Sequence, residues 1–244
     1  MNISGHIAIA VGLAGRHDVN AVGGAGPDAA ELLGVALPDV GAMGRFRLLG
    51  RTSHAGVSAG IRLHYRSDEA FHRHPWFRDH NRALTAELVD RGFGRGPAKA
   101  CSHVGIELLL DGSLLRDPTV AAAYQSAFGL IPEVRPQLAE LVEPAHQAGW
   151  LAHLDRLANR SAPTDLAQPP AVALRLLRIL AGRPRLAFRP DQTNELTAAL
   201  ARHQPSIEAT SASLAAELVD QLADQRHGAG KAASAIGGGL SASA

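Results

Sequence analysis

The sequence is poor in cysteine, lysine and aromatic residues. Cys101 is the only cysteine in 244 residues, which excludes an intrachain disulfide and a zinc site built from several thiolates. Aromatic residues make up 4% of the chain, so Leu, Ala and Val must supply most of the core. That bias favours helices over a β-sandwich, whose strands need more aromatic and β-branched residues.

Long apolar runs are also missing. No stretch approaches the ~20 apolar residues that a membrane-spanning helix needs. The opening MNISGHIAIAVGLAG has no basic leader and carries His6 within its apolar part, so we expect no signal peptide and a cytoplasmic location.

The formal net charge of +1 gives no indication of a nucleic-acid partner, but the charge is unevenly spread. Residues 41–100 contain eleven basic and five acidic residues. An excess of positive charge favours a phosphorylated or acidic partner. The alternative is a solvated face in a chain whose basic residues are nearly all arginine.

The spacing of apolar residues predicts an all-α protein, a single helical bundle over residues 1–226 with a disordered Gly/Ala/Ser tail over 227–244. Residues 2–14 are expected to be a helix or an extended segment, 15–28 and 41–55 to be irregular, and 160–170 to be a loop or linker. Pro38 is expected to end or kink the helix that contains it. Helices are predicted over 29–37, 57–73, 76–90, 98–115, 118–128, 132–158, 170–182 and 191–226.

Two of these helices carry a histidine and carboxylates at four-residue spacing: His64, Asp68 and His72, then His103, Glu107 and Asp111. Residues four apart lie on one face of a helix. If the two helices face each other, these side chains would hold a divalent cation, with Mn or Mg favoured and Zn or Fe as alternatives.

Simpler interpretations stay open for each residue. A buried Glu107 would also be satisfied by an arginine on a neighbouring helix, and His64 alone would be an ordinary structural histidine. His72 lies near a helix end and is expected to be exposed, to contact phosphate or to support other ligands. His6 and Asp39 are weak candidates individually, but both are ligand types that would reach one cavity from neighbouring helices.

Several segments in order along the chain resemble those of the acyl carrier protein phosphodiesterases, helical metal-dependent hydrolases that are distant relatives of the HD-domain superfamily. MNISGHIAIA is similar to the family opening MNFLAHLHLA, and GVALPD to a G-N-L-x-A-D segment. GIRLHYRSD is similar to the family's GIxxHRxID helix, IELLLDGSL to LDxxxDHFL, and GRPRL to RRPRL. The matches extend over residues 1–225.

The resemblance implies an HD-like fold and release of 4′-phosphopantetheine from holo acyl carrier protein with Mn or Mg. The positive excess over residues 41–100 would then dock the acidic carrier protein. Asp39, Asp68 and Glu107 would be the catalytic carboxylates. The implied metal ligands are His6, Asp39, His64, Asp68 and Asp111. Arg62, Arg66 and His103 would bind the substrate.

Two positions depart from the family pattern. Gly112 replaces a histidine that follows the second aspartate, and Arg62 replaces the first histidine of GIHxH; His103 is a candidate to compensate. The segment Gly34–Asp39 also resembles part of the zinc-dependent phospholipase C-like proteins. The alternatives to carrier-protein hydrolysis are therefore a hydrolase of another phosphoester, nucleotide or phospholipid, and an inactive helical binding protein.

Overall fold

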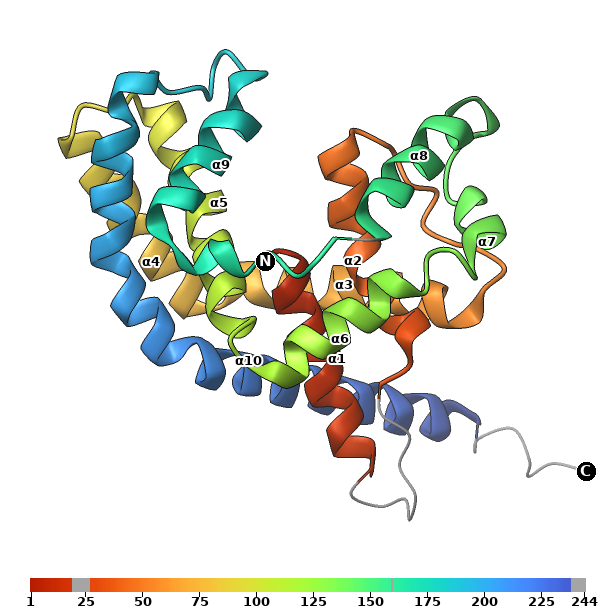
Figure 1. Ribbon diagram of the computed structural model, residues 1–244. Coiled ribbons are helices and arrows are strands. Elements are labelled where there is room, and N and C mark those ends of the chain that lie inside the picture. The colour runs from red at the N-terminus through yellow and green to blue at the C-terminus, as the bar shows by residue number, and fades with distance from the viewer. Residues whose placement is uncertain (19–26, 159, 238–244) are drawn as a thin grey trace, which may run out of the picture.

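A computed structural model describes residues 1–18, 27–158 and 160–237, and over these residues the chain forms helices and no strand (Figure 1). The all-α prediction is confirmed. The α-helices are α1 (Ile3–Asp18), α2 (Ala29–Gly44), α3 (Ala55–Arg73), α4 (Pro75–Asp90), α5 (Arg95–Leu114), α6 (Pro118–Gly129), α7 (Arg135–Ala139), α8 (Gln147–Ala158), α9 (Pro169–Ala181) and α10 (Thr193–Gly237). Three 3₁₀ turns are η1 (Pro144–His146), η2 (Thr164–Ala167) and η3 (Pro190–Gln192).

Prolines account for the two clearest differences from the predicted elements. The helix predicted over 132–158 is wrong as one element, because Pro136 and Pro144 each start a new turn and divide it into α7, η1 and α8. Pro38 does not end α2, which continues to Gly44. Leu37 and Val40 on either side of this proline are fully buried, so core packing outweighs the lost backbone hydrogen bond.

The predicted loops and tail partly lie outside the described residues. Helix α1 extends to Asp18, four residues into the predicted loop, and residues 19–26 lie outside the described part. Helix α10 continues to Gly237, which includes part of the predicted tail. Residues 238–244 of that tail also lie outside the described residues. The predicted linker at 160–170 contains η2, whose Leu166 and Ala167 are buried. That segment is therefore a loop packed on α5.

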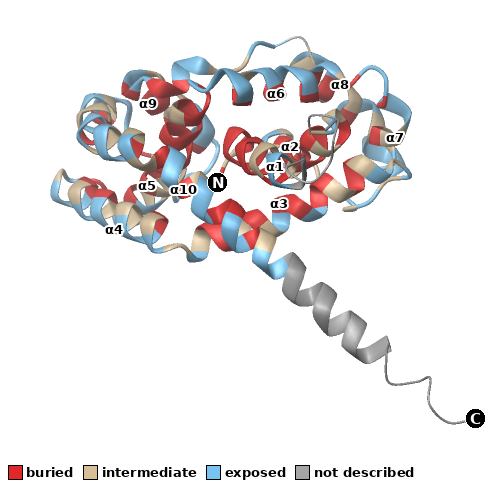
Figure 2. Ribbon diagram, turned by 90° about the horizontal axis from the view of Figure 1, so that it is seen from below, coloured by how far each residue is buried: buried red, intermediate tan, exposed pale blue. Residues whose placement is uncertain are grey.

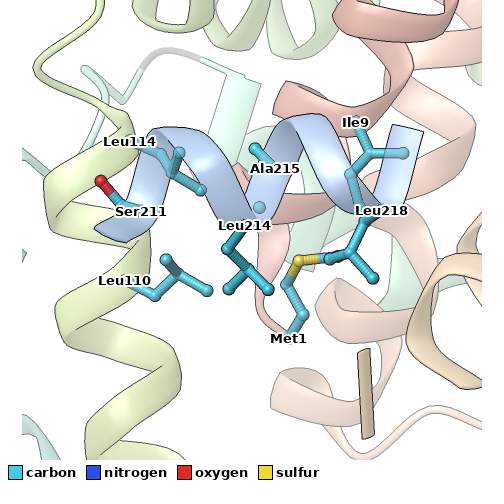
Figure 3. A pocket seen from close by; sticks show the side chains of 9 residues that line it. Met1, Ile9, Leu110, Leu114, Ser211, Leu214, Ala215 and Leu218 are labelled. Atoms are coloured by element: carbon cyan, nitrogen blue, oxygen red, sulfur yellow. The ribbon is translucent and has the colours of Figure 1, made fainter. Parts of the chain in front are cut away.

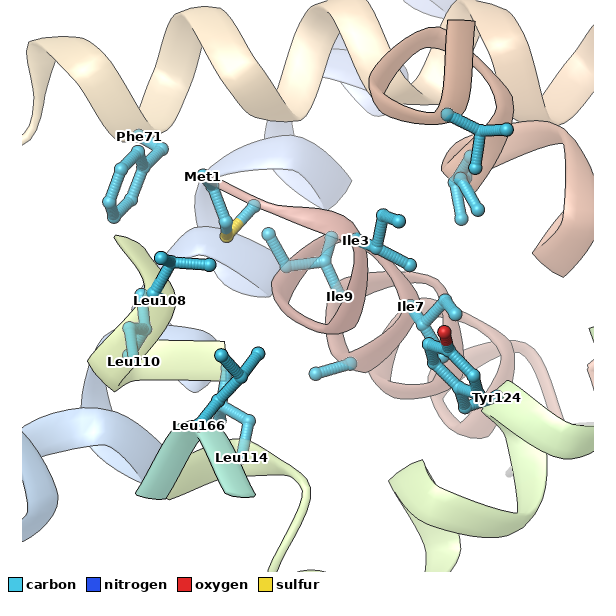
Figure 4. Close-up of a cluster of buried hydrophobic side chains, with 14 of the residues drawn as sticks. Met1, Ile3, Ile7, Ile9, Phe71, Leu108, Leu110, Leu114, Tyr124 and Leu166 are labelled. Atoms are coloured by element: carbon cyan, nitrogen blue, oxygen red, sulfur yellow. The ribbon is translucent and has the colours of Figure 1, made fainter. Parts of the chain in front are cut away.

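Helix α1 begins in the middle of the molecule and crosses α10 (Figure 1). Helix α2 packs on α3, α4 packs on α5, and α10 contacts α1, α3, α4, α5 and α9. Buried residues face inward from all of these helices (Figure 2). Figure 4 shows Met1, Ile7, Phe71 and Leu110 within one continuous core. The N-terminus is therefore buried at the centre.

Two glycines set the distance between α2 and α3. A Cβ atom on Gly60 would lie 2.8 Å from the Gly34 Cα atom and would overlap the Glu31 carbonyl oxygen, and a Cβ atom on Gly34 would overlap the Val57 carbonyl oxygen. The backbones touch at a spacing that no larger residue allows. Both glycines belong to the segments that resemble the hydrolase family, and their contact brings Asp39 and His64 to one place.

No helix in the described part of the chain has both the length and the apolar character to span a membrane.

Candidate metal centre

Three helices bring His6, Asp39 and His64 together in the centre of the molecule. His6 comes from α1, Asp39 from α2 and His64 from α3. One ligand atom from each residue lies within 4.8 Å of the other two. We call these three residues the buried cluster, because His6 is fully buried and His64 is 5% exposed. Asp39 is partly covered, with 22% of its side chain exposed.

Both imidazoles of the buried cluster are held through their Nδ1 atoms. His64 Nδ1 lies 2.8 Å from the Val35 carbonyl oxygen, and His6 Nδ1 lies 2.7 Å from Ser67 Oγ. Ser67 Oγ also lies 2.9 Å from the Leu63 carbonyl oxygen, to which it donates. His64 Nδ1 therefore carries the proton and leaves Nε2 as the atom available to a metal, an arrangement typical of histidine ligands. His6 Nε2 lies 3.0 Å from the Met1 carbonyl oxygen, so a metal bound at this atom would replace that contact.

Burial suppresses positive charge on these rings. It lowers the pKa of His6 well below its usual range, with a further contribution from His64, and it also lowers the pKa of His64. The two ring centroids lie 4.0 Å apart. Neutral imidazole is the form that binds a metal ion.

Asp39 has a buried oxygen without a partner. Its Oδ2 atom lies 3.9 Å from His6 Nε2 and accepts no hydrogen bond from any described residue. Burial raises the pKa of Asp39 well above its usual range, and the carboxylates of Asp111, Glu107 and Asp68 raise it further, against the opposing effect of the Met1 α-ammonium. A buried acceptor in this state is costly unless a proton or a cation satisfies it.

A second group lies beside the first, where α3 faces α5. It consists of His72, His103 and Glu107, whose ligand atoms also lie within 4.8 Å of one another. The side chains of His72 and His103 are 31% and 44% exposed, whereas that of Glu107 is 10% exposed. We call this group the open cluster.

Asp68 and the α-amino group of Met1 connect the two clusters. Asp68 Oδ1 lies 3.8 Å from His6 Nε2 and 3.2 Å from His72 Nε2. The Met1 α-ammonium lies 3.3 Å from Asp68 Oδ1 and 3.0 Å from Glu107 Oε1. Burial alone would raise the pKa of both carboxyl groups, but hydrogen bonds from His72 and His103, with the ammonium, hold each pKa below its usual range.

Asp111 lies next to the clusters but belongs to neither of them. Its oxygens accept hydrogen bonds from the backbone amides of Ser4 at 3.1 Å and Gly5 at 3.0 Å. These are amides of the first turn of α1, where a carboxylate is favoured by the helix dipole. Burial raises the pKa of Asp111 to about 7. In this geometry Asp111 anchors the helix that carries His6, whereas the family resemblance implies a metal ligand.

The two arginines expected to bind phosphate do not lie at the clusters. Arg62 is exposed, and the Arg66 guanidinium donates a hydrogen bond to the Leu222 carbonyl oxygen of α10 at 3.2 Å. Because Arg62 and Arg66 are each two residues away from His64 along α3, they project from another side of the helix. His103, the third residue expected to bind substrate, lies in the open cluster.

Gly112 has no space for a side chain. A Cβ atom there would overlap the backbone of Leu166 and Ala167 in η2. The histidine that the family pattern has at this position is therefore excluded by the packing of η2 on α5.

A small apolar pocket lies on the other side of Met1, between α1, α5 and α10 (Figure 3). Its walls include Met1, Ile9, Leu110 and Leu218, and the hydroxyl of Ser211 at one end is hydrogen-bonded to Ser113 and to the Glu208 carbonyl oxygen. The Met1 side chain packs so closely that a Cβ atom on Gly5 would overlap it. This apolar contact holds the Met1 α-amino group toward the carboxylates.

Carboxyl groups outnumber the single ammonium group around Met1. Four carboxyl groups (Asp39, Asp68, Glu107 and Asp111) influence one another's ionisation, and one ammonium group lies among them. Buried like charges are unfavourable without a compensating cation. The mixed nitrogen and oxygen donors suit Mn, Fe or Zn, because Mg prefers oxygen ligands.

Comparisons with known proteins found no family model, no curated protein and no solved structure that matches this chain. The resemblance to the carrier protein phosphodiesterases therefore rests on the segments quoted from the sequence.

Two groups beside the predicted ligands were not among the candidate ligands. His72 was expected to be exposed, to contact phosphate or to support other ligands, although its spacing from Asp68 is the same as that between His103 and Glu107. That repeated four-residue spacing was the available signal. The Met1 α-amino group had no sequence signal, because its position depends on how α1 is inserted between α3 and α5.

Proposed function

We propose that this protein is a divalent-metal-dependent phosphodiester hydrolase whose first cation is held by the buried cluster and Asp68. The partnerless Oδ2 atom of Asp39 is the observation that carries the proposal, because it faces His6 Nε2 and belongs to the same three-residue group as His64. Buried nitrogen and oxygen donors gathered from three helices, one of them a carboxylate oxygen without a hydrogen-bond partner, are typical of a metal site.

A divalent cation supplies one kind of chemistry here: it lowers the pKa of a bound water and neutralises charge on phosphoryl oxygens. His6 and His64 would contribute nitrogen, while Asp39 and Asp68 would contribute oxygen. The rings are held by Ser67 and the Val35 carbonyl, so little reorganisation is needed for binding. Asp68 and Glu107 lie toward the open cluster and are the carboxylates positioned to accept a proton from the attacking water.

The proposed substrate is a phosphodiester, with holo acyl carrier protein as the first candidate through the family resemblance, which also implies an HD-like fold. The positive excess over residues 41–100 supports an acidic protein partner, and such a substrate agrees with the expected cytoplasmic location. A nucleotide or phospholipid is the alternative substrate, because each can offer the same phosphodiester linkage.

One observation favours a second candidate, a helical cation-binding protein without hydrolytic activity. The η2 backbone occupies the space of the histidine that the family pattern has at position 112. If that histidine is required for catalysis, the metal site would remain while hydrolysis would be lost.

The test uses the purified full chain, stripped with a chelator and reloaded with Mn²⁺. Hydrolysis of bis-p-nitrophenyl phosphate, holo acyl carrier protein and a cyclic nucleotide is measured for wild type, His64→Ala and Asp39→Asn. His146→Ala and Asp79→Asn are matched controls, since both residues are exposed. The controls should retain activity, and the two cluster variants should lose about 100-fold or more.

The outcomes separate the candidates. Mn²⁺ binding with hydrolysis that depends on His64 supports the hydrolase, and the preferred substrate identifies its class. Mn²⁺ binding without hydrolysis of any of the three substrates supports the inactive binding protein. Failure of Mn²⁺, Mg²⁺ and Zn²⁺ to bind or to raise the melting temperature contradicts both.

A further inference from the structure

We infer that the open cluster and Asp68 bind a second divalent cation, so that the site is dinuclear with Asp68 as the shared carboxylate. This inference rests on the proposed function and deepens it. It gives Asp68 and Glu107 the role of ligands in place of the proton transfer considered above.

The proposed ligands come from two helices, and the two ligands on each helix have the same four-residue spacing. Asp68 and His72 are four residues apart on α3, and His103 and Glu107 are four residues apart on α5. His72 Nε2 lies 3.6 Å and His103 Nε2 lies 3.2 Å from Glu107 Oε1. Each pair therefore directs an imidazole nitrogen and a carboxylate into the space between the helices.

The two imidazoles are already aligned. Their ring centroids lie 4.9 Å apart at an interplanar angle of 19°, and both rings make T-shaped contacts with Phe77. Phe77 is buried, so it gives the rings a fixed wall. Ligands whose orientation is held by packing bind a metal at a lower entropic cost.

A positive group of the protein already lies between the carboxylates of this region. The Met1 α-ammonium is within 3.3 Å of Asp68 Oδ1 and within 3.0 Å of Glu107 Oε1. This contact is independent of the histidines and shows that the space between Asp68 and Glu107 favours positive charge. A divalent cation would compete there with a single charge of +1.

Asp68 is the residue that would join the two sites. The same oxygen, Oδ1, faces His6 Nε2 of the buried cluster and His72 Nε2 of the open cluster. In two-metal hydrolases the ions lie roughly 3.5–4 Å apart, which is close enough for one carboxylate to bind both. The partial exposure of His72 and His103 also gives a cation and a phosphoester an approach from solvent.

The experiment counts cations on the full chain. Chelator-stripped protein is titrated with Mn²⁺ by calorimetry, and the same samples are studied by electron paramagnetic resonance. We expect two Mn²⁺ per wild-type chain, with the six-line spectrum of isolated Mn²⁺ weakened when the second ion binds. His72→Ala and His103→Ala should each bind one ion and retain that six-line spectrum. The exposed control His146→Ala should bind two.

His64→Ala provides the converse test, because it should remove the ion of the buried cluster and leave the one of the open cluster. Circular dichroism verifies that each variant is folded. If His103→Ala does not fold, His103→Gln replaces it, because it keeps the polarity of the side chain. The number of Mn²⁺ ions bound per chain of this variant then tests the second site.

One Mn²⁺ per wild-type chain, or two in folded His72→Ala and His103→Ala, would overturn the second site. A single ion with full hydrolysis would contradict this inference alone. Two ions without hydrolysis of any phosphoester would contradict the proposed function alone.

Discussion

The buried and open clusters use the same residue types in different surroundings. His6 and Asp39 of the buried cluster have pKa values moved by burial in the direction that disfavours charge. Glu107 of the open cluster has a lowered pKa, because His103 and the Met1 α-ammonium outweigh its burial. The metal-free buried cluster is therefore mostly uncharged, whereas Glu107 of the open cluster is ionised and paired with the Met1 α-ammonium. The difference shows that ligand types alone do not set the charge of a site.

The largest expected effect comes from separating the helices of the buried cluster. Gly60→Ala adds a Cβ atom that would overlap the Glu31 carbonyl oxygen and press on the Gly34 backbone. We expect a loss of about 3 kcal/mol in the free energy of unfolding, measured by urea denaturation, and loss of the first cation.

The matched control is Gly129→Ala, at the end of α6, where nothing lies within 4 Å of the added atom. This variant should be neutral or more stable by about 0.5 kcal/mol, because alanine favours helix. Equal stability of the two variants would show that the α2–α3 contact does not limit the site.

The next effect is a pH dependence at Asp111. Its pKa is raised to about 7 in the folded chain, whereas an unfolded aspartate has a pKa of about 3.9. Between these values the folded state holds a proton that the unfolded state has lost, so this group's contribution to stability falls as pH rises.

We therefore expect the stability of metal-free wild type relative to Asp111→Asn to fall by a few kcal/mol between roughly pH 4 and pH 7. Urea denaturation of both proteins at several pH values measures the difference. The comparison is needed because the lowered pKa values of Asp68, His6 and His64 act in the opposite direction, making stability fall as pH falls. A constant difference would contradict the raised pKa of Asp111.

Asp39→Asn is expected to lower the affinity for metal without lowering the stability of the metal-free protein. The change removes a buried carboxylate that lies among others, so the metal-free protein should be as stable as wild type or about 1 kcal/mol more stable at pH 8. Mn²⁺ affinity should fall about tenfold or more, measured by calorimetry. Unchanged affinity would remove Asp39 from the ligands.

The smallest effect is expected in the open cluster without metal. His103→Ala removes a ring that is 44% exposed, so it should change the free energy of unfolding by about 0.5 kcal/mol or less. His6→Ala, which empties a fully buried position, should cost about 2 kcal/mol or more. Thermal or urea denaturation measures the free energy of unfolding of the two variants. Similar losses of stability in both would show that the open cluster is needed for the stability of the fold.

The sequence predicted which residues are near the site for the most part, but it did not predict how these residues contact one another. His6, Asp39, His64 and Asp68 were predicted and do converge, because helical spacing and apolar context are local properties. Asp111 was predicted with them, yet its oxygens accept the first amides of α1. Hydrogen bonds between residues more than a hundred positions apart leave no periodic pattern in a sequence.

Local sequence properties were sufficient for the helical fold class, for most helix ranges and for the four-residue spacing of the ligand pairs. Gly34 and Gly60 entered only through the segments that resemble the hydrolase family, and their contact with each other was not predicted. Only the packed chain decided that α1 enters between α3 and α5, that η2 fills the space beside Gly112, and that Arg66 turns to α10. These outcomes depend on side chains and backbones from distant segments that compete for the same space, which helix propensity and periodicity do not contain.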